Sequence, residues 1–266
     1  MTSEYKDTFR GTAWYYARYR EGYQDEFFDY IRDRFNLSKD DRVLDLGCGT
    51  GQIAIPISKF VYEVVAMDPE PEMIKEGKEQ AKQADARNVV WIEYGSEDLP
   101  GMKQELGTFK MVVMGTSFHW MDREKTLDEL YGIITDDGGI VIVSNTSIWV
   151  EAPSDWQLTV REVVKKWLGE KRRAGSGYFQ VLPRRHEEFV RESEFKRMEM
   201  WSNHWTLSSS LDEVIGNLYS TSMANPYILG DRKEDFEKDL REALMKLDPS
   251  GIFLSEGDSE AILAWK

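Results

Sequence analysis

Three glycines at alternate positions, Gly47, Gly49 and Gly51, follow the apolar segment Arg42–Leu46 and precede a stretch with helix-forming composition. Glycines at such a place let the backbone turn tightly and bring its amides close to a ligand. Asp68 ends the next apolar segment, 17 positions after Gly51. A carboxylate there can accept hydrogen bonds from both hydroxyls of a ribose. The pattern predicts a site for a nucleoside-containing cofactor; the alternative is a tight strand-to-helix turn with no ligand.

The spacing of the glycines separates two classes of cofactor. Dinucleotides favour G-x-G-x-x-G, which needs a glycine at position 52, where the sequence has Gln52. Asp45 lies two residues before Gly47, and a carboxylate there suits a cationic amino group better than a pyrophosphate. S-adenosylmethionine carries an α-amino group, a ribose and an adenine but no phosphate. We therefore expect S-adenosylmethionine as the cofactor.

Two further side chains are candidates for the chemistry itself. His119 follows the apolar segment Phe109–Met114, where ligands bind at the carboxyl edge of a parallel sheet. Its ordinary pKa of about 6.5 suits a general base; the alternative is that it packs its loop. Tyr16 and Tyr19, in the segment YYARYR, could direct their hydroxyls at the cofactor or the acceptor, or pack a helix onto the core. His186 and His204 have no such context, and the scattered histidines predict no metal site.

The elements expected to position these residues alternate between strand and helix. Such alternation predicts βαβ units and a mainly parallel sheet, and continuous apolar strands are typical of a sheet covered on both faces. After an amphipathic helix over Glu21–Phe35, the expected strands are Arg42–Leu46, Val61–Met67, Val89–Glu93, Phe109–Met114 and Ile140–Ser144, and the expected helices are Gln52–Phe60 (despite Pro56), Pro71–Ala84 and Arg123–Ile134.

The rhythm changes after Ser144. Helical patterns over Asp155–Leu168 and His186–Glu192 predict a helical cap, inserted at about residues 145–194 and lying over the carboxyl edge of the sheet. Residues 1–40 are predicted to form an N-terminal helical lid, and residues 41–266 the main domain. The last part is expected to hold a strand at 195–206, helices at Leu211–Met223 and Asp231–Leu247, and a final strand at Ala261–Trp265.

Composition excludes several classes of function. The 34 Lys and Arg residues against 48 Asp and Glu give a net charge of −14, which disfavours nucleic acids and anionic membrane surfaces as partners. A single cysteine, Cys48, excludes a disulfide framework. No apolar run reaches the ~20 residues of a membrane span, and the first residues lack the apolar core of a signal peptide. These features predict a cytoplasmic protein with a small-molecule partner; they leave its oligomeric state open.

The segments VLDLGCGTGQIAIPIS, VVAMDPEPEMI, IEYGSEDLP, FKMVVMGTSFHWMDREKTLDEL and DDGGIVIVS resemble, in that order, class I S-adenosylmethionine-dependent methyltransferases. This resemblance implies a doubly wound α/β fold with a mostly parallel, Rossmann-like, seven-stranded sheet whose last strand is antiparallel. YYARYREGY, FHW and WTLSSSLDEVIGNLYSTSMAN resemble the small-molecule subgroup similar to trans-aconitate methyltransferase.

The resemblance also implies roles for individual residues. Asp68 would hold the ribose hydroxyls, and Thr116 would lie beside the sulfonium. Gly95 stands where the family often has an acidic residue, so the adenine contact passes to its neighbours. The other implied cofactor contacts are Asp45, Gly47, Cys48, Gly49 and Gly51 at the methionine half, Pro69 and Met73 beside the adenine, and Ser96 and Glu97 at the adenine edge.

The function implied is transfer of a methyl group from S-adenosylmethionine to a small molecule. We expect an oxygen acceptor, a carboxylate or a hydroxyl, with His119 and Tyr16 as catalytic candidates. N- or C-methylation of a small metabolite is an alternative, as are a non-catalytic module that binds S-adenosylmethionine and an NAD-dependent oxidoreductase.

Overall fold

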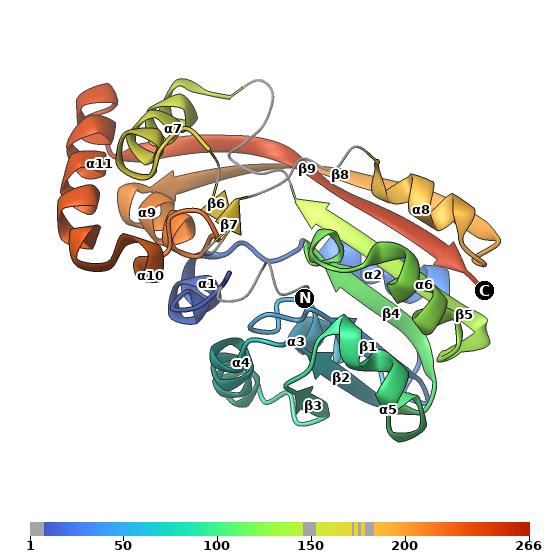
Figure 1. Ribbon diagram of the computed structural model, residues 1–266. Helices are drawn as coiled ribbons and strands as arrows, with labels where there is room; N and C mark the ends of the chain where they lie inside the picture. Colours follow the sequence, from blue (N-terminus) through green and yellow to red (C-terminus); the bar gives the residue numbers. More distant parts are fainter. Residues whose placement is uncertain (1–7, 146–152, 172, 175–176, 179–183) are drawn as a thin grey trace.

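The computed structural model describes residues 8–145, 153–171, 173–174, 177–178 and 184–266. Its main sheet has seven strands in the order β3-β2-β1-β4-β5-β9-β8 (Figure 1). The strands β1 to β5 pair in parallel, and β9 pairs antiparallel with both β5 and β8. The predicted doubly wound, mostly parallel, seven-stranded sheet is confirmed. Its strands are β1 (Arg42–Leu46), β2 (Glu63–Met67), β3 (Val89–Ile92), β4 (Phe109–Gly115), β5 (Ile134–Asn145), β8 (Arg197–Ser210) and β9 (Ile252–Trp265).

Helices cover both faces of this sheet. On one face α2 (Asp25–Phe35), α3 (Ala54–Ile57) and α4 (Pro71–Gln83) bury their apolar side chains. On the other lie α5 (Leu99–Leu106), α6 (Arg123–Tyr131) and α8 (His186–Glu192). The central strands are therefore buried on both sides, which explains why they are continuous apolar runs.

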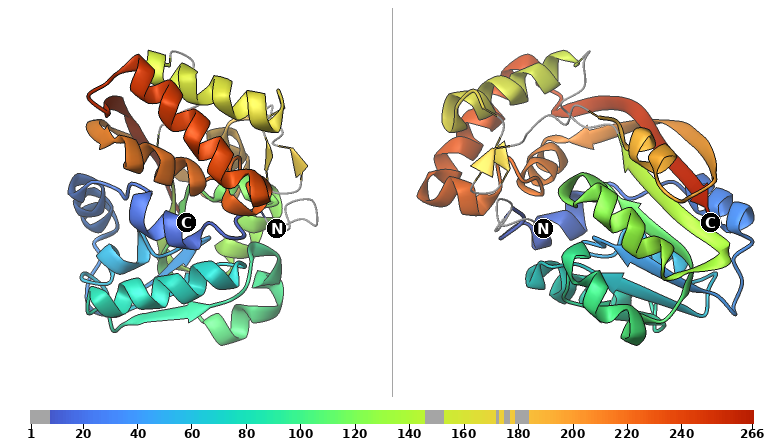
Figure 2. Two further views of the ribbon diagram at one scale, coloured as in Figure 1. Left: turned by 90° about the vertical axis from the view of Figure 1, so that its left-hand side faces the viewer. Right: turned by 45° about the vertical axis from the view of Figure 1, so that its right-hand side comes forward.

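A third apolar cluster lies beyond the sheet. It joins α7 (Asp155–Leu168), α9 (Leu211–Tyr219) and α11 (Lys233–Leu247) to Phe253 of β9; we call these three helices the helical cap. Strand β5 ends at Asn145, which pairs with Ser259, whereas β8 and β9 stay paired as far as Ser210 and Ile252. Figures 1 and 2 show that this two-stranded extension carries the helical cap at one end of the long strands.

The range predicted for the cap, about 145–194, differs from the cluster that forms. Of that range, α7 belongs to the helical cap, but α8 packs beside α6 on the sheet. Helices α9 and α11 come from the insertion between β8 and β9. Residues 146–152, 172, 175–176 and 179–183 of the predicted cap, and residues 1–7 of the predicted lid, lie outside the described residues.

Several expected boundaries were wrong. Helix α3 spans Ala54–Ile57 rather than Gln52–Phe60, because residues 51–53 form a turn and Pro56 fits a helix only in its first turn. Helix α2 begins at Asp25, and α6 ends at Tyr131, ahead of β5. Strand β9 starts at Ile252 instead of Ala261. Helix α1 (Ala13–Tyr19) lies within the predicted N-terminal helical lid, whereas α5, α10 (Pro226–Leu229) and the paired strands β6 (Arg173–Ala174) and β7 (Gly177–Tyr178) were not predicted.

Candidate active site

The loop after β1 closes against the loop after β4. Gly47 has φ of +76°, and a Cβ there would lie 2.5 Å from Cβ of Ser117. Only glycine permits this contact without strain. The Ser117 hydroxyl donates to the carbonyl of Leu46 at 2.8 Å, and the N–H groups of Gly47 and Cys48 donate to the carbonyl of Met67. The loop is thereby fixed to the ends of both neighbouring strands.

Two buried carboxylates flank this loop. Asp45 accepts a hydrogen bond from the N–H of Ala54 at 2.9 Å, and Asp68 accepts from those of Gly49 and Glu70, both at 2.9 Å. Burial raises the pKa of Asp45 to about 7 and that of Asp68 to about 6. Within the described ranges no lysine or arginine forms an ion pair with Asp45. A buried carboxylate without a cation fits a cationic ligand group such as the α-ammonium of S-adenosylmethionine.

A small cavity of about 60 Å³ opens beside Asp68. It brings together residues predicted from five separate segments of the chain. Trp120 and Phe9, which are not among the predicted cofactor contacts, also line it. The predicted residues lining it are Tyr16, Gly47, Gly49, Asp68, Pro69, Met73, Ser96 and Thr116.

Three predicted cofactor residues lie elsewhere among the described residues. The Glu97 carboxylate folds back on Gly95, where a Cβ would lie 2.4 Å from its oxygen. Gly51 lies beneath Trp91, and a Cβ there would lie 2.8 Å from that ring. The ring of Tyr19 packs on Gly216 of α9, so this tyrosine fixes α1 to the helical cap and lines neither cavity described in this section.

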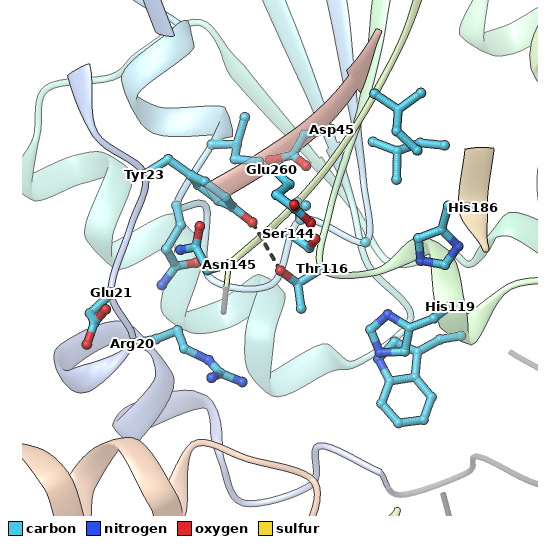
Figure 3. Close-up of a pocket in the computed structure, with 18 of the residues that line it drawn as sticks. Arg20, Glu21, Tyr23, Asp45, Thr116, His119, Ser144, Asn145, His186 and Glu260 are labelled. Carbon is cyan, nitrogen blue, oxygen red and sulfur yellow. Dashed lines mark hydrogen bonds between the residues drawn. The ribbon is translucent and has the colours of Figure 1, made fainter. Parts of the chain in front are cut away.

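A larger cavity of about 640 Å³ adjoins the small one. Tyr16, Gly47 and Thr116 line both, and Asp45 and Cys48 line the large one. We call it the active-site cavity. Figure 3 shows Tyr23 and Thr116 between Arg20 and Glu21 on one side and His119 and His186 on the other.

His119 and His186 lie on the same side of the active-site cavity with their rings facing each other. His119 lies in the 3₁₀ turn η3 (Phe118–Trp120) after β4, and His186 is the first residue of α8. Their ring centroids are 6.5 Å apart with the planes at 20° (Figure 3). Burial and the nearby Arg123 lower the pKa of His186, so its ring is neutral at pH 7. In the sequence alone, His186 had no such context, because no local pattern relates it to His119, 67 positions earlier.

The opposite wall comes from the segment after α1. The Tyr23 hydroxyl lies 3.2 Å from the Thr116 hydroxyl, and Thr116 has φ of +50°, a strained conformation for a β-branched residue. The Arg20 guanidinium lies 5.1 Å from the centre of the Tyr16 ring and forms no ion pair with any described carboxylate. Burial raises the pKa of Tyr16, so its phenol is a hydrogen-bond donor rather than a base. The sequence analysis missed Arg20 and Tyr23, although both lie in YYARYREGY.

The described residues contain no group of three or more His, Cys, Asp or Glu side chains arranged to hold a metal ion. None of the helices in the described ranges has the length and apolar composition that crossing a membrane requires.

Residues 43–138 match the protein family described as "Methyltransferase domain". A putative methyltransferase of Dictyostelium discoideum is 22% identical over 98% of this chain and 92% of its own length. A probable S-adenosylmethionine-dependent methyltransferase of Saccharomyces cerevisiae is 24% identical over 40% of this chain and 36% of its own. Residues 43–138 carry a methyltransferase domain.

Two further comparisons show how much of this chain and of its relatives the similarity covers. The match to an uncharacterized methyltransferase of Schizosaccharomyces pombe, at 26% identity, spans 54% of this chain and about half, 56%, of that relative. The structure of a putative type II methyltransferase from Anaeromyxobacter dehalogenans aligns with a TM-score of 0.58 at 17% identity, over 93% of this chain and 97% of that one. This likeness shows that the fold extends over nearly the whole chain.

Proposed function

We propose that the chain transfers the methyl group of S-adenosylmethionine to an oxygen of a small molecule, a carboxylate or a hydroxyl. One observation carries the proposal. The active-site cavity is lined by Asp45 and Gly47 and also by His119 and His186. A cofactor held by the loop and an acceptor held by the histidines would therefore share one cavity, as an in-line displacement needs.

The charged groups fit the amino-acid end of the cofactor. The buried Asp45 carboxylate would bind the α-ammonium group, and Arg20, which lines the same cavity and pairs with no described carboxylate, would bind the α-carboxylate. Asp68 would accept hydrogen bonds from the ribose hydroxyls, and Pro69 and Met73 would flank the adenine. The bound cofactor supplies the electrophilic methyl group on its sulfonium.

The acceptor side needs little further chemistry. A carboxylate acceptor is already ionised at pH 7 and requires only alignment. A hydroxyl acceptor requires removal of a proton, which the His119 imidazole would accept. Tyr16 and Tyr23, whose pKa values burial raises, would donate hydrogen bonds that orient the two reactants. The net charge of −14 supports a small acceptor over a nucleic acid.

N-methylation is the second candidate, for a specific reason. Glu21, Glu187 and Glu260 also line the active-site cavity and would attract an amine. Burial is the chief cause of a raised pKa of Glu21. The resemblance of YYARYREGY to the trans-aconitate methyltransferase subgroup further supports an acid as the acceptor.

The test is formation of S-adenosylhomocysteine from S-adenosylmethionine with three matched panels of acceptors: carboxylic acids, alcohols and amines. We expect turnover with acids or alcohols, a methylated product by mass spectrometry, and no turnover by the Asp68→Ala variant. Turnover with amines alone would replace the proposal by N-methylation. Saturable cofactor binding with no turnover in any panel would favour a non-catalytic binding module.

A further inference from the structure

A second cavity of about 320 Å³ lies between the helical cap and the paired extension of β8 and β9. We call it the distal chamber. Its walls come from α7, α9, the segment after α1, and both long strands. Five residues line both this chamber and the active-site cavity, so the two spaces adjoin. These shared residues are Arg20, Glu21, Asn145, Thr221 and Met223.

The junction between the two cavities is held by hydrogen bonds. The Asn145 amide donates to the carbonyl of Gly22 at 3.3 Å and accepts from the Ser259 hydroxyl at 2.7 Å. The Thr221 hydroxyl donates to the carbonyl of Leu218 at 2.7 Å. These two polar side chains are thus already bonded to the protein, and the charged residues of the junction are Arg20 and Glu21.

Seven apolar side chains line the distal chamber, beside polar ones that include Ser208, Ser255 and Glu256. Of its charged residues, Arg18 pairs with Glu76, and Glu213 accepts hydrogen bonds from Ser210. Burying apolar ligand surface against such walls is favourable, by about fourfold in affinity per methylene group. The apolar residues that line it are Trp156, Val160, Trp205, Leu207, Val214, Leu218 and Met223.

One polar group in this lining is unpaired. The indole N–H of Trp205 is buried and has no acceptor among the described residues. By contrast, the indole N–H of Trp156 donates to the carbonyl of Leu254 at 2.9 Å, and that of Trp167 to Asp239 at 2.7 Å. A buried donor without an acceptor is destabilising, and a ligand oxygen beside Trp205 would remove that penalty.

We propose that the methyl acceptor is elongated: its reacting oxygen lies in the active-site cavity, and its apolar part, a chain or ring bearing one oxygen acceptor, fills the distal chamber. This inference rests on the proposed function, because it assigns the acceptor class of the same site. It makes Leu207 and Trp205 specificity-determining residues for the length and the polarity of that apolar part.

The test measures binding separately from turnover. Protein saturated with S-adenosylhomocysteine is titrated calorimetrically with straight-chain monocarboxylic acids of about four to about twelve carbons, and the same acids are assayed for methyl ester formation. We expect affinity to rise with chain length by roughly fourfold per methylene until the chamber is full. A flat or falling profile would overturn the inference.

Matched variants locate the effect. Leu207 lines the chamber, whereas Thr206, its neighbour on β8, is exposed and does not. Leu207→Trp should weaken binding of the long acids by roughly tenfold or more and leave the short acids unchanged. Thr206→Trp should leave both unchanged. Equal effects of the two variants, judged on protein with unchanged cofactor affinity, would overturn the inference.

Trp205→Phe tests the polar contact. It should weaken a long acid that carries a carbonyl or hydroxyl oxygen along its chain, and leave the plain acid of equal length unchanged. An equal loss of affinity for both acids would contradict the proposed role of the indole N–H. If long acids bind as expected but no methyl ester forms, methyl transfer to a carboxylate is contradicted. Binding of an apolar chain in the distal chamber would still stand.

Discussion

The backbone N–H of Gly49 donates a hydrogen bond of 2.9 Å to the carboxylate of Asp68. This bond joins the glycine loop after β1 to the end of β2, the neighbouring strand. The second oxygen of Asp68 accepts from the N–H of Glu70, so the carboxylate is oriented before any ligand binds. The glycine loop and Asp68 are the two sequence features that predict a nucleoside site, and Asp68 lies 17 positions after Gly51. In the structure they are bonded directly to each other.

Replacing Asp68 by alanine removes the oriented carboxylate. We expect Asp68→Ala to weaken binding of S-adenosylhomocysteine about a hundredfold, because hydrogen bonds to a charged group contribute about 1.5–3 kcal/mol each. Titration calorimetry measures this affinity. Glu105→Ala, at an exposed position of α5, is the control and should bind as the parent does. An affinity unchanged in Asp68→Ala would contradict the assigned ribose contact.

Asp45 makes the stability of the ligand-free protein depend on pH. Its pKa is about 7 when folded, against an ordinary value of 3.8. Between these values the folded chain holds a proton that the unfolded chain has lost, so the free energy of unfolding falls as pH rises from about 4 to about 7, by up to about 4 kcal/mol. Asp68, raised to about 6, acts in the same direction.

Asp45→Asn should therefore flatten much of this pH dependence and stabilise the ligand-free protein above pH ~7. Urea unfolding across the pH range measures it. The exposed Asp29→Asn variant is the control, since Asp29 pairs with Arg32 on the surface. Parallel stability curves for Asp45→Asn and the parent would show that the Asp45 carboxylate is not desolvated.

We expect replacement by alanine to have opposite effects on stability at Gly47 and at Gly101. At Gly47, φ of +76° and a Cβ position 2.5 Å from Ser117 make alanine strained. Gly101 lies in α5 with nothing within 4 Å of an added Cβ. We expect Gly47→Ala to lower the melting temperature, and Gly101→Ala to raise stability by roughly 0.8–1.0 kcal/mol. Thermal unfolding of both variants measures these effects. An unchanged melting temperature for Gly47→Ala would contradict this loop geometry.

His119 distinguishes the two classes of oxygen acceptor. With a hydroxyl acceptor, His119→Ala should lower kcat by about a hundredfold through loss of the base; with a carboxylate the loss should stay below about tenfold. Affinity for S-adenosylhomocysteine should not change in either case. His204→Ala, on the exposed face of β8 beside Asp258, is the matched control. Unaltered kcat with a hydroxyl acceptor would remove His119 as the base.

The glycine loop and Asp68 could be predicted from the sequence because each acts through its own short segment and strand end. The same holds for β1 to β4, whose apolar runs are continuous, and for the Ile140–Ser144 part of β5; the start of β5 at Ile134 was not predicted, because residues 135–139 are polar or glycine. Strands β8 and β9 were only partly predicted, because residues 207–210 are mostly serine, residues 252–260 include serine and acidic residues, and both lie on a two-stranded extension with little core to bury.

Residues brought together from distant segments could not be predicted. His186 meets His119 only because α8 packs beside α6. Tyr19 was expected at the cofactor, yet it packs on Gly216, almost 200 residues later. The distal chamber combines α7, α9 and both long strands, and no single stretch of sequence carries its shape.

The most direct test of the central claim follows the methyl group itself. The protein is incubated with S-adenosylmethionine carrying an isotopically labelled methyl group and with the acid and alcohol panels, and the products are analysed by mass spectrometry. We predict a methylated oxygen product formed in equal amount with S-adenosylhomocysteine, and none with Asp68→Ala. Label that stays on S-adenosylmethionine with every acceptor, while the cofactor binds saturably, would contradict methyl transfer by this site.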